Sequence, residues 1–202
     1  MEKSKAFASE AQRKRGRWKL FLIIGVCAAP MMASYFTYYV IKPAGRANYG
    51  ALLDPRQYPI PRFGSAALDG KPAALEDYKG KWLMLQVAGG DCNEVCRTHL
   101  FAMRQLRLMQ GKEMERIERV WLITDARSPD TMLMREYDGT GMLRVDVSLL
   151  KAWLPTDRGT MMEDHIYLID PLGNLMMRFP RNADPNRMKK DISRLLRASA
   201  IR

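Results

Sequence analysis

Residues 82–96 read WLMLQVAGGDCNEVC, and this stretch decides the fold. Its first six residues, 82–87, form a short and almost uninterrupted apolar run, which is typical of a strand buried on both faces of a sheet. The pair Gly89 and Gly90 follows directly and ends the strand in a tight turn. A buried strand that ends in such a turn predicts a layered domain with this strand near its centre.

A helix should follow the turn. Asp91 and Glu94 have the spacing of a capping box, so we expect the helix to start at Cys92 and to run toward Gly111. Cys96 then lies on its apolar face. The stretch therefore predicts a strand, a turn and a helix, with two cysteines at the junction.

The rest of the chain alternates in the same way. We expect two further strand and helix pairs, then a hairpin whose turn reads DPLGN, and finally a helix that Asp184 caps. The expected elements are strands at 120–124, 143–147, 166–169 and 175–179, and helices at 128–137, 148–154 and from 185 onward. This order predicts an α/β sandwich with a mixed sheet and one folded domain, residues 63–202.

Before this domain lies a span suited to a membrane. Residues 20–41 contain no charged side chain, and 22 residues are enough for a helix to cross a hydrocarbon layer of about 30 Å. The apolar region of a cleaved signal peptide is shorter, about 7 to 15 residues, so we expect a retained anchor. Residues 42–62, which include four prolines, are expected to form an extended linker.

The charge pattern agrees with a membrane protein. The formal net charge is +11, and residues 1–19 hold seven basic against two acidic residues. Basic residues before a span keep that end in the cytoplasm, so we expect residues 1–19 to be a cytoplasmic tail and the folded domain to lie in the periplasm. The remaining charge is spread along the chain, which argues against a nucleic-acid partner.

The two neighbouring cysteines are the candidate catalytic residues. At helical spacing, Cys96 lies about 40° around the helix from Cys92, so the two sulfurs share a face. They either form a disulfide or bind one soft cation, copper(I) or zinc. We expect Cys92 to be the exposed partner, with its thiolate favoured by the first helical turn. The alternative is a structural disulfide, or two buried thiols.

Two histidines are candidates for a third metal ligand. His99 lies on the same helical face as Cys96 and either adds a ligand or covers the pair. His165 is the better candidate, because it precedes a strand whose edge can face the start of the helix. Two thiolates and one imidazole would suit copper(I). Most of the fifteen methionines are expected to fill the core.

Three segments resemble the SCO/SenC family, whose members are thioredoxin-like, membrane-anchored proteins. These segments are LEDYKGKWLMLQV before the cysteine pair, VWLITDARSPDT, and HIYLIDPLGNLM, and the similarity covers roughly residues 63–197. The chain departs from the family in two ways. Asn93 and Arg97 stand where the family has proline after each cysteine, and the family's histidine position falls on Met162, three residues before His165.

The resemblance implies a thioredoxin-like sandwich and a function. The chain would be an assembly factor for cytochrome c oxidase in a bacterial inner membrane. It would deliver copper(I) to the copper site of that oxidase or reduce the thiols there, with an oxidase subunit or other assembly factors as partners. Cys92 and Cys96 would be the sulfur ligands, and His165, or Met162 in its place, the third ligand. The alternatives are a general membrane-tethered thiol–disulfide oxidoreductase and a chemically inactive thioredoxin-like scaffold.

Overall fold

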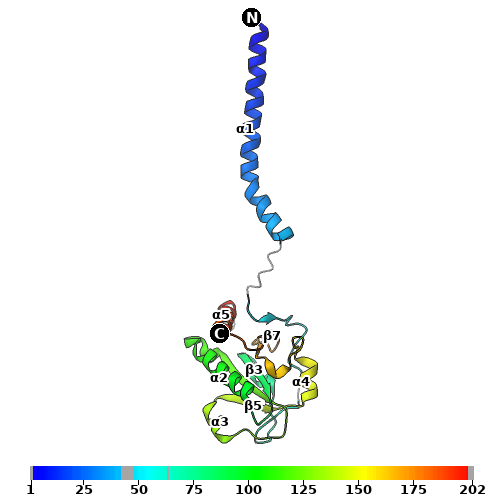
Figure 1. The fold of residues 1–202 in the computed structure, drawn as a ribbon, viewed down its shortest axis with the longest axis vertical. Helices are drawn as coiled ribbons and strands as arrows, with labels where there is room; N and C mark the ends of the chain where they lie inside the picture. Colours follow the sequence, from blue (N-terminus) through cyan, green and yellow to red (C-terminus); the bar gives the residue numbers. More distant parts are fainter. Residues whose placement is uncertain (1, 42–47, 63, 200–202) are drawn as a thin grey trace. The chain divides into compact units, whose positions relative to one another are not determined.

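The chain divides into two compact units, Met1–Ala47 and Asn48–Arg202. The structure is a computed structural model that describes residues 2–41, 48–62 and 64–199 (Figure 1). Residues 42–47, at the start of the expected linker, lie outside the described residues. So do residues 63 and 200–202, at the two ends of the expected domain.

The first unit is helical throughout its described part. Helix α1 covers Glu2–Phe36 and continues as a π-helix, η1, over Thr37–Ile41. Within it, the segment Trp18–Tyr39 is long and apolar enough to cross a membrane, and none of its most apolar window is buried. Apolar side chains exposed along a segment of this length suit a lipid environment, so the structure agrees with the predicted anchor.

The second unit is built on a mixed seven-stranded sheet with the order β1-β7-β6-β3-β4-β5-β2. Strands β3, β4 and β5 are parallel to one another, and the other pairs are antiparallel. The strands are β1 (Ala51–Leu52), β2 (Ala66–Ala67), β3 (Trp82–Ala88), β4 (Ile117–Ile123), β5 (Thr140–Arg144), β6 (Tyr167–Ile169) and β7 (Leu175–Arg178). The buried strand and the hairpin predicted from the sequence are confirmed.

Helices cover both faces of the sheet (Figure 1). Helices α2 (Glu94–Leu108) and α5 (Pro185–Ala198) contribute to one apolar core, and α4 (Val147–Trp153) contributes to the other. Successive side chains of β3 point to opposite faces of the sheet and so pack into the two cores in turn. Trp82 and Met84 belong to the first core, and Leu83 and Leu85 to the second. Shorter helical elements are α3 (Thr131–Glu136), η2 (Leu75–Tyr78), η3 (Gly111–Arg116) and η4 (Met162–Asp164).

The folded unit starts earlier than the sequence predicts. We expected a linker up to residue 62, but β1 pairs with β7 and Pro59 forms a bridge with Asn174. The buried carboxylate of Asp191 on α5 also accepts hydrogen bonds from the backbone N–H groups of Tyr49 and Gly50, at 2.7 and 2.9 Å. These contacts with distant parts of the chain hold residues 48–62 on the domain.

Two other predicted boundaries are corrected. Helix α3 begins at Thr131, after the cap Asp130 whose side chain accepts from the Met132 N–H, so Pro129 is not its first residue. The strand expected at 143–147 ends at Arg144, because Asp146 caps α4. In both cases an aspartate fixes where the helix starts, because its side chain accepts a hydrogen bond from a backbone N–H that has no partner within the helix.

Candidate functional site

The cysteine pair lies where β3 passes into α2. Helix α2 begins at Glu94, and the side chain of Asn93, not Asp91, caps it by accepting from the Cys96 N–H at 3.0 Å. The predicted helix start at Cys92 is therefore wrong. Cys92 precedes the cap and has a φ of 44°, a left-handed conformation that is uncommon for residues other than glycine. Cys96 lies in the first turn of the helix.

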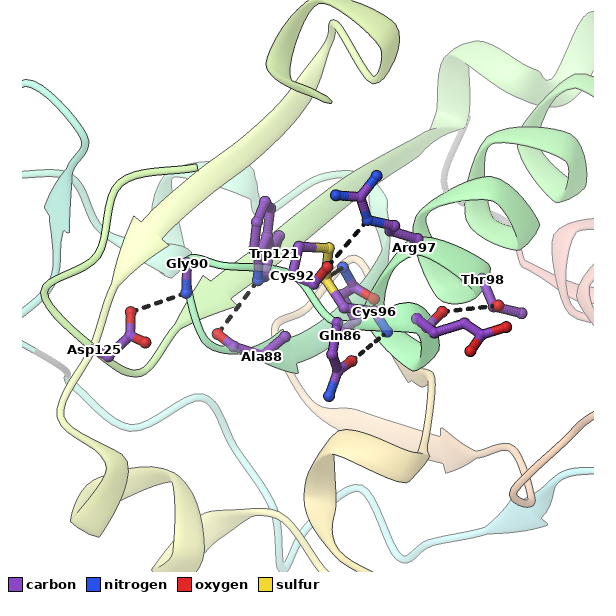
Figure 2. The surroundings of a disulfide bond; sticks show 11 residues. Gln86, Ala88, Gly90, Cys92, Cys96, Arg97, Thr98, Trp121 and Asp125 are labelled. Atoms are coloured by element: carbon purple, nitrogen blue, oxygen red, sulfur yellow. Dashed lines mark hydrogen bonds between the residues drawn. A yellow bond between two sulfur atoms is a disulfide. The ribbon is translucent and has the colours of Figure 1, made fainter. Parts of the chain in front are cut away.

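Cys92 and Cys96 form a disulfide, with their Cα atoms 5.2 Å apart (Figure 2). The two sulfurs therefore lie side by side, as the spacing predicts. The expectation that Cys92 is exposed is wrong, because Cys92 is 1% exposed and Cys96 is 2% exposed. Both belong to the core that α2 and α5 cover, so a reaction partner does not reach the sulfurs in this state without local movement.

Two polar side chains lie beside the disulfide. The Gln86 amide donates from Nε2 to Cys96 Sγ at 3.4 Å, and Arg97 donates from Nε to the carbonyl oxygen of Cys92 at 3.2 Å (Figure 2). Gln86 is buried within β3, whereas Arg97 is exposed on α2. Arg97 therefore joins the backbone of the disulfide loop, at the Cys92 carbonyl, to a side chain that is exposed to solvent.

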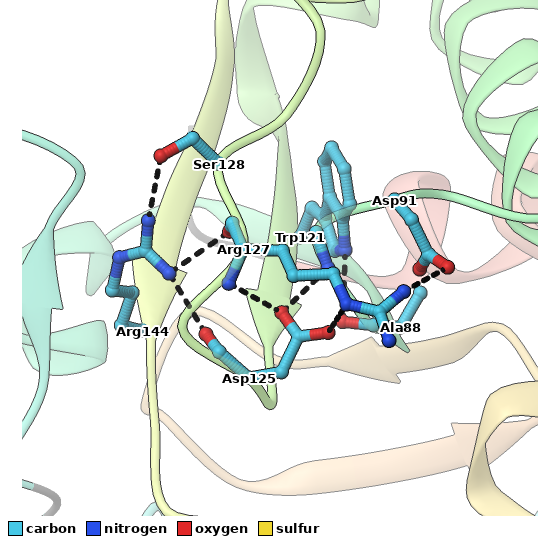
Figure 3. A network of polar contacts seen from close by, with 8 residues as sticks. Ala88, Asp91, Trp121, Asp125, Arg127, Ser128 and Arg144 are labelled. Carbon is cyan, nitrogen blue, oxygen red and sulfur yellow. Dashed lines mark hydrogen bonds and ion pairs between the residues drawn. The ribbon is translucent and has the colours of Figure 1, made fainter.

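The turn before the cysteines is held by a polar network from β4 and β5 (Figure 3). The Asp125 carboxylate accepts from the backbone N–H groups of Gly90 and Arg127 at 2.8 and 3.1 Å. Arg127 also forms an ion pair with Asp91 at 2.6 Å. Arg144 donates to the carbonyl oxygens of Asp125 and Arg127, at 2.8 and 3.0 Å. The network fixes the loop that carries Cys92 against the neighbouring strand ends.

Sequence reasoning did not single out Gln86, Asp125 or Arg127 as part of this site. Gln86 carries a usable signal, because it is the one polar residue in the apolar run 82–87. Asp125 lies two residues after the end of a buried strand, at the sheet edge where parallel strands end. Arg127 offers no comparable signal, since its partner Asp91 is 36 residues away.

The ring nitrogens of His165 are engaged by groups other than the sulfurs. His165 is fully buried, and both of its ring nitrogens are engaged at 2.7 Å, Nδ1 with the carbonyl oxygen of Phe179 and Nε2 with the Thr160 hydroxyl. A carbonyl oxygen only accepts, so Nδ1 holds a proton that it donates to Phe179. The ring lies 6.0 Å from that of Tyr167, which belongs to the second core.

The Met162 side chain is buried in the second core, whereas the two cysteines belong to the first core. Across residues 2–41, 48–62 and 64–199, no group of three or more His, Cys, Asp and Glu side chains is placed to hold a metal ion. The three ligands expected from the sequence are therefore not assembled in this arrangement.

His99 lies on the buried side of α2, and its Nδ1 has no hydrogen-bond partner among the residues that the structure describes. Burial lowers the pKa of His99 to about 4, with a further lowering from His165 that Asp164 opposes. Burial also lowers the pKa of His165. Both imidazoles are therefore uncharged near neutral pH, and the protein must bury a charge or unfold locally to protonate them.

Acid should consequently destabilise the fold. Between pH 6.5 and 4, the unfolded chain binds a proton at His99 that the folded chain does not, so stability falls as the pH falls through this window. From pH 7 to pH 5 we expect His99 to cost about 2 kcal/mol of unfolding free energy. Urea unfolding at the two pH values measures the loss, and His99→Leu should reduce it. An equal loss in this variant would contradict the assignment to His99.

Two family models match the chain. A transmembrane-like, thioredoxin-like C-terminal domain matches residues 82–199, and a transmembrane-like N-terminal domain matches residues 10–40. No curated protein matches the chain significantly.

Several solved structures share the fold. Copper-bound ScoI of Bradyrhizobium japonicum has 20% sequence identity and a TM-score of 0.51, over 66% of this chain and 97% of its own. The thioredoxin domain of a thiol-disulfide oxidoreductase from Bacteroides vulgatus has 17% identity and a TM-score of 0.53, over 71% and 99%. BsSco, a member of the Sco family of cytochrome c oxidase assembly proteins, has 17% identity and a TM-score of 0.51, over 72% and 98%. The SCO/SenC resemblance is thus confirmed for the fold.

Proposed function

The chain belongs to the transmembrane-like, thioredoxin-like family, and on this premise we propose that it is a membrane-anchored thiol–disulfide protein that assists the assembly of cytochrome c oxidase. The observation that carries the proposal is the Cys92–Cys96 disulfide at the junction of β3 and α2. In α/β folds, ligands bind at the carboxyl ends of the parallel strands, and a local movement there would bring the buried sulfurs to a partner. The client we propose is a disulfide at the copper site of the oxidase.

The reaction uses both cysteines. With the pair reduced, the Cys92 thiolate attacks one sulfur of the client disulfide, which releases one client thiolate and leaves a mixed disulfide. The Cys96 thiolate then attacks the Cys92 sulfur and releases the second client thiolate. The client gains two electrons and the chain is left as the Cys92–Cys96 disulfide, the state in this structure. A dithiol donor must reduce it again before the next cycle.

The anchor supports this role. Basic residues before Trp18–Tyr39 favour a cytoplasmic N-terminus, which would place the domain in the periplasm of a bacterial inner membrane. That compartment is oxidising and permits stable disulfides. Tethering would raise the concentration of the domain near a membrane-embedded client without any need for tight binding.

Copper delivery is less well supported by the residues present. A copper(I) site with two thiolates needs a further soft or imidazole ligand. Both ring nitrogens of His165 have other partners, Phe179 and Thr160, and Met162 is buried in the second core, whereas the cysteines belong to the first. This arrangement does not fit a three-ligand copper site, and we route no step through the metal.

The proposal is tested by two measurements on the full chain. We expect the reduction potential of the pair to lie between about −120 and −270 mV, the range of proteins that exchange disulfides. A value below about −300 mV would indicate a structural disulfide and overturn the proposal. Deletion of the chain should leave the oxidase copper site oxidised and inactive, and an added membrane-impermeant dithiol should restore it. Normal oxidase in the deletion strain would also refute the proposal.

The role of Arg97 provides a separate prediction. Arg97→Ala removes the hydrogen bond to the Cys92 carbonyl and frees the loop that buries the sulfurs. A hydrogen bond of this kind contributes about 1 kcal/mol, so we expect dithiothreitol to reduce the disulfide about fivefold faster. Stopped-flow reduction kinetics measure this rate. Arg104→Ala, a change on the same helix that removes a bond to the Glu136 carbonyl, is the control and should leave the rate unchanged. Equal rates in the wild type and Arg97→Ala would show that Arg97 does not gate access.

A further inference from the structure

Helix α5 carries a row of basic side chains on its exposed face. Four of them are exposed to solvent and lie within an arc of about 80° around the helix axis, Arg187, Lys190, Arg194 and Arg197. The row is about 15 Å long. The apolar side chains on the opposite face of α5 pack into the first core, so the row is the part of the helix that is open to a partner.

The positive charge of this row is largely unbalanced within the domain. In the described part of the chain, Arg187, Lys190 and Arg197 form no ion pair, whereas Arg194 pairs with Asp191 at 3.7 Å. Neighbours along the row are three or four positions apart, a spacing at which like charges destabilise a helix. An anionic partner outside the domain would offset this repulsion.

An aromatic ring holds the first residue of the row. Arg187 lies in the first turn of α5, where the helix dipole disfavours a positive charge. Its guanidinium stacks on the ring of Tyr49, 4.1 Å from the ring centroid. The backbone N–H of Tyr49 also donates to Asp191 of α5 at 2.7 Å. Tyr49 therefore joins α5 to the start of the folded unit.

The start of the folded unit is also the part of the domain that follows the membrane anchor. Tyr49 comes ten residues after Tyr39, the last residue of the apolar segment. Ten residues reach at most about 35 Å when fully extended, so the surface of the bilayer stays within reach of α5. Tethering also keeps the concentration of lipid headgroups around the row high.

The exposed face of α5 suits lipid headgroups better than a protein. The core of a protein interface is typically apolar and poor in charged residues, but no large apolar side chain of α5 is exposed in its described residues. Clusters of lysine and arginine on an amphipathic helix are attracted to anionic lipids instead. Here the apolar face of the helix is occupied by the core, so the attraction would be electrostatic alone.

We propose that α5 docks on the anionic phospholipid headgroups of the bilayer that holds the anchor, through Arg187, Lys190, Arg194 and Arg197. Docking would give the tethered domain one preferred orientation on the membrane surface. The inference goes beyond the thiol chemistry, because it depends on the anchor and on α5 and not on the redox state of the cysteines.

Chemical labelling of Lys190 in the full chain tests the inference. The chain is placed in nanodiscs of phosphatidylcholine alone or of phosphatidylcholine with phosphatidylglycerol, and acetylation by an uncharged N-hydroxysuccinimide ester is followed by mass spectrometry. Lys190 should react at least about fivefold more slowly in the anionic discs, the effect expected of even one cation near a charged surface. Lys71, on the exposed turn after β2, should react equally in both. Equal rates for Lys190 in the two kinds of disc would overturn the inference.

Neutralising part of the row should remove this protection. The double variant Arg194→Gln, Arg197→Gln keeps Lys190 as the reporter, and each lost cation should weaken docking about fivefold. The rate at Lys190 should then return to that in neutral discs. The control Lys151→Gln, Arg158→Gln removes the same charge on and beside α4, which contributes to the other core, and should leave the protection intact. Circular dichroism checks that both variants are folded, and full protection in the α5 variant would contradict the proposal.

Salt and native membranes separate the remaining explanations. At about 1 M salt the Debye length is about 3 Å, so the protection should disappear. Protection that persists at this salt concentration would indicate apolar contact and overturn docking by charge. Protection in native membranes but not in protein-free anionic nanodiscs would assign the row to an acidic protein and overturn the lipid proposal as well. A disulfide that does not exchange would refute the proposed function and leave the docking of α5 untouched.

Discussion

Cys92→Ser and Cys96→Ser should each abolish disulfide exchange and destabilise the domain by several kcal/mol. The disulfide closes a loop of four-residue separation, and the chain-entropy model assigns such a short loop about 2 kcal/mol. Each serine also buries a hydroxyl in an apolar core, at a cost of about 1 to 3 kcal/mol if the hydroxyl is unpaired. Both variants should fail to support assembly of an active oxidase.

The two variants should not be equally unstable. In Cys96→Ser the Gln86 amide, which now donates to the sulfur, can donate to the new hydroxyl. Cys92 has no side-chain partner of this kind in the described contacts, so Cys92→Ser should be the less stable of the two. Urea unfolding of the full chain in detergent measures the difference.

Cys27→Ser is the matched control, since Cys27 is a free, exposed cysteine in the apolar segment of α1 and should affect neither the exchange nor the stability of the domain. Restoration of the oxidase by both Cys92→Ser and Cys96→Ser would contradict thiol chemistry and favour a scaffold.

Gly90→Ala should strongly destabilise the domain. A Cβ atom at Gly90 would overlap the backbone carbonyl of Arg127, and this carbonyl is itself held by Arg144. Backbone cannot move aside as a flexible side chain can, so either the turn or the loop after β4 must shift. The shift would also strain the bond from the Gly90 N–H to Asp125. We expect a loss of about 3 kcal/mol, the upper end for inserting an atom into a packed site.

Neighbouring glycines provide graded controls for this prediction. A Cβ at Gly89 would lie 2.7 Å from a side-chain oxygen of Asp125, which can rotate away, so Gly89→Ala should cost less. A Cβ at Gly64 would meet nothing within 4 Å, and Gly64→Ala should stay within about 0.5 kcal/mol of the wild type. Thermal or urea unfolding ranks the three variants. Equal stability of Gly90→Ala and Gly64→Ala would show that the turn is not fixed against the loop after β4.

The short edge strands show what local pattern cannot reveal. Strands β1 and β2 have two residues each, too few for a periodicity, and each exists because a longer strand pairs with it. Residues 48–62 therefore read as a linker from composition alone, although Asp191 and β7 hold part of them on the domain. Pairing between distant segments supplies the energy that the local sequence lacks.

The same limit applies to the helix start. Asp91 and Asn93 are both good capping residues, and the sequence does not rank them. In the structure Asp91 pairs with Arg127 from the loop after β4, and Asn93 is left to cap α2. With Asn93 as the cap, Cys92 lies outside the helix in a left-handed conformation, and Asp91, the other candidate cap, forms an exposed ion pair with a residue 36 positions along the chain.

The sequence by itself determined the membrane span, the order of the main strands and helices, and the closeness of Cys92 and Cys96, because apolar runs, periodicity and helical spacing are local properties. Tertiary structure alone decided that the sulfurs are buried, that Met162 is buried in the second core, and that both nitrogens of His165 have partners. It also decided that His99 of α2 lines a groove together with residues of α5. These properties depend on which distant surfaces meet, and packing between segments far apart in the sequence fixes them.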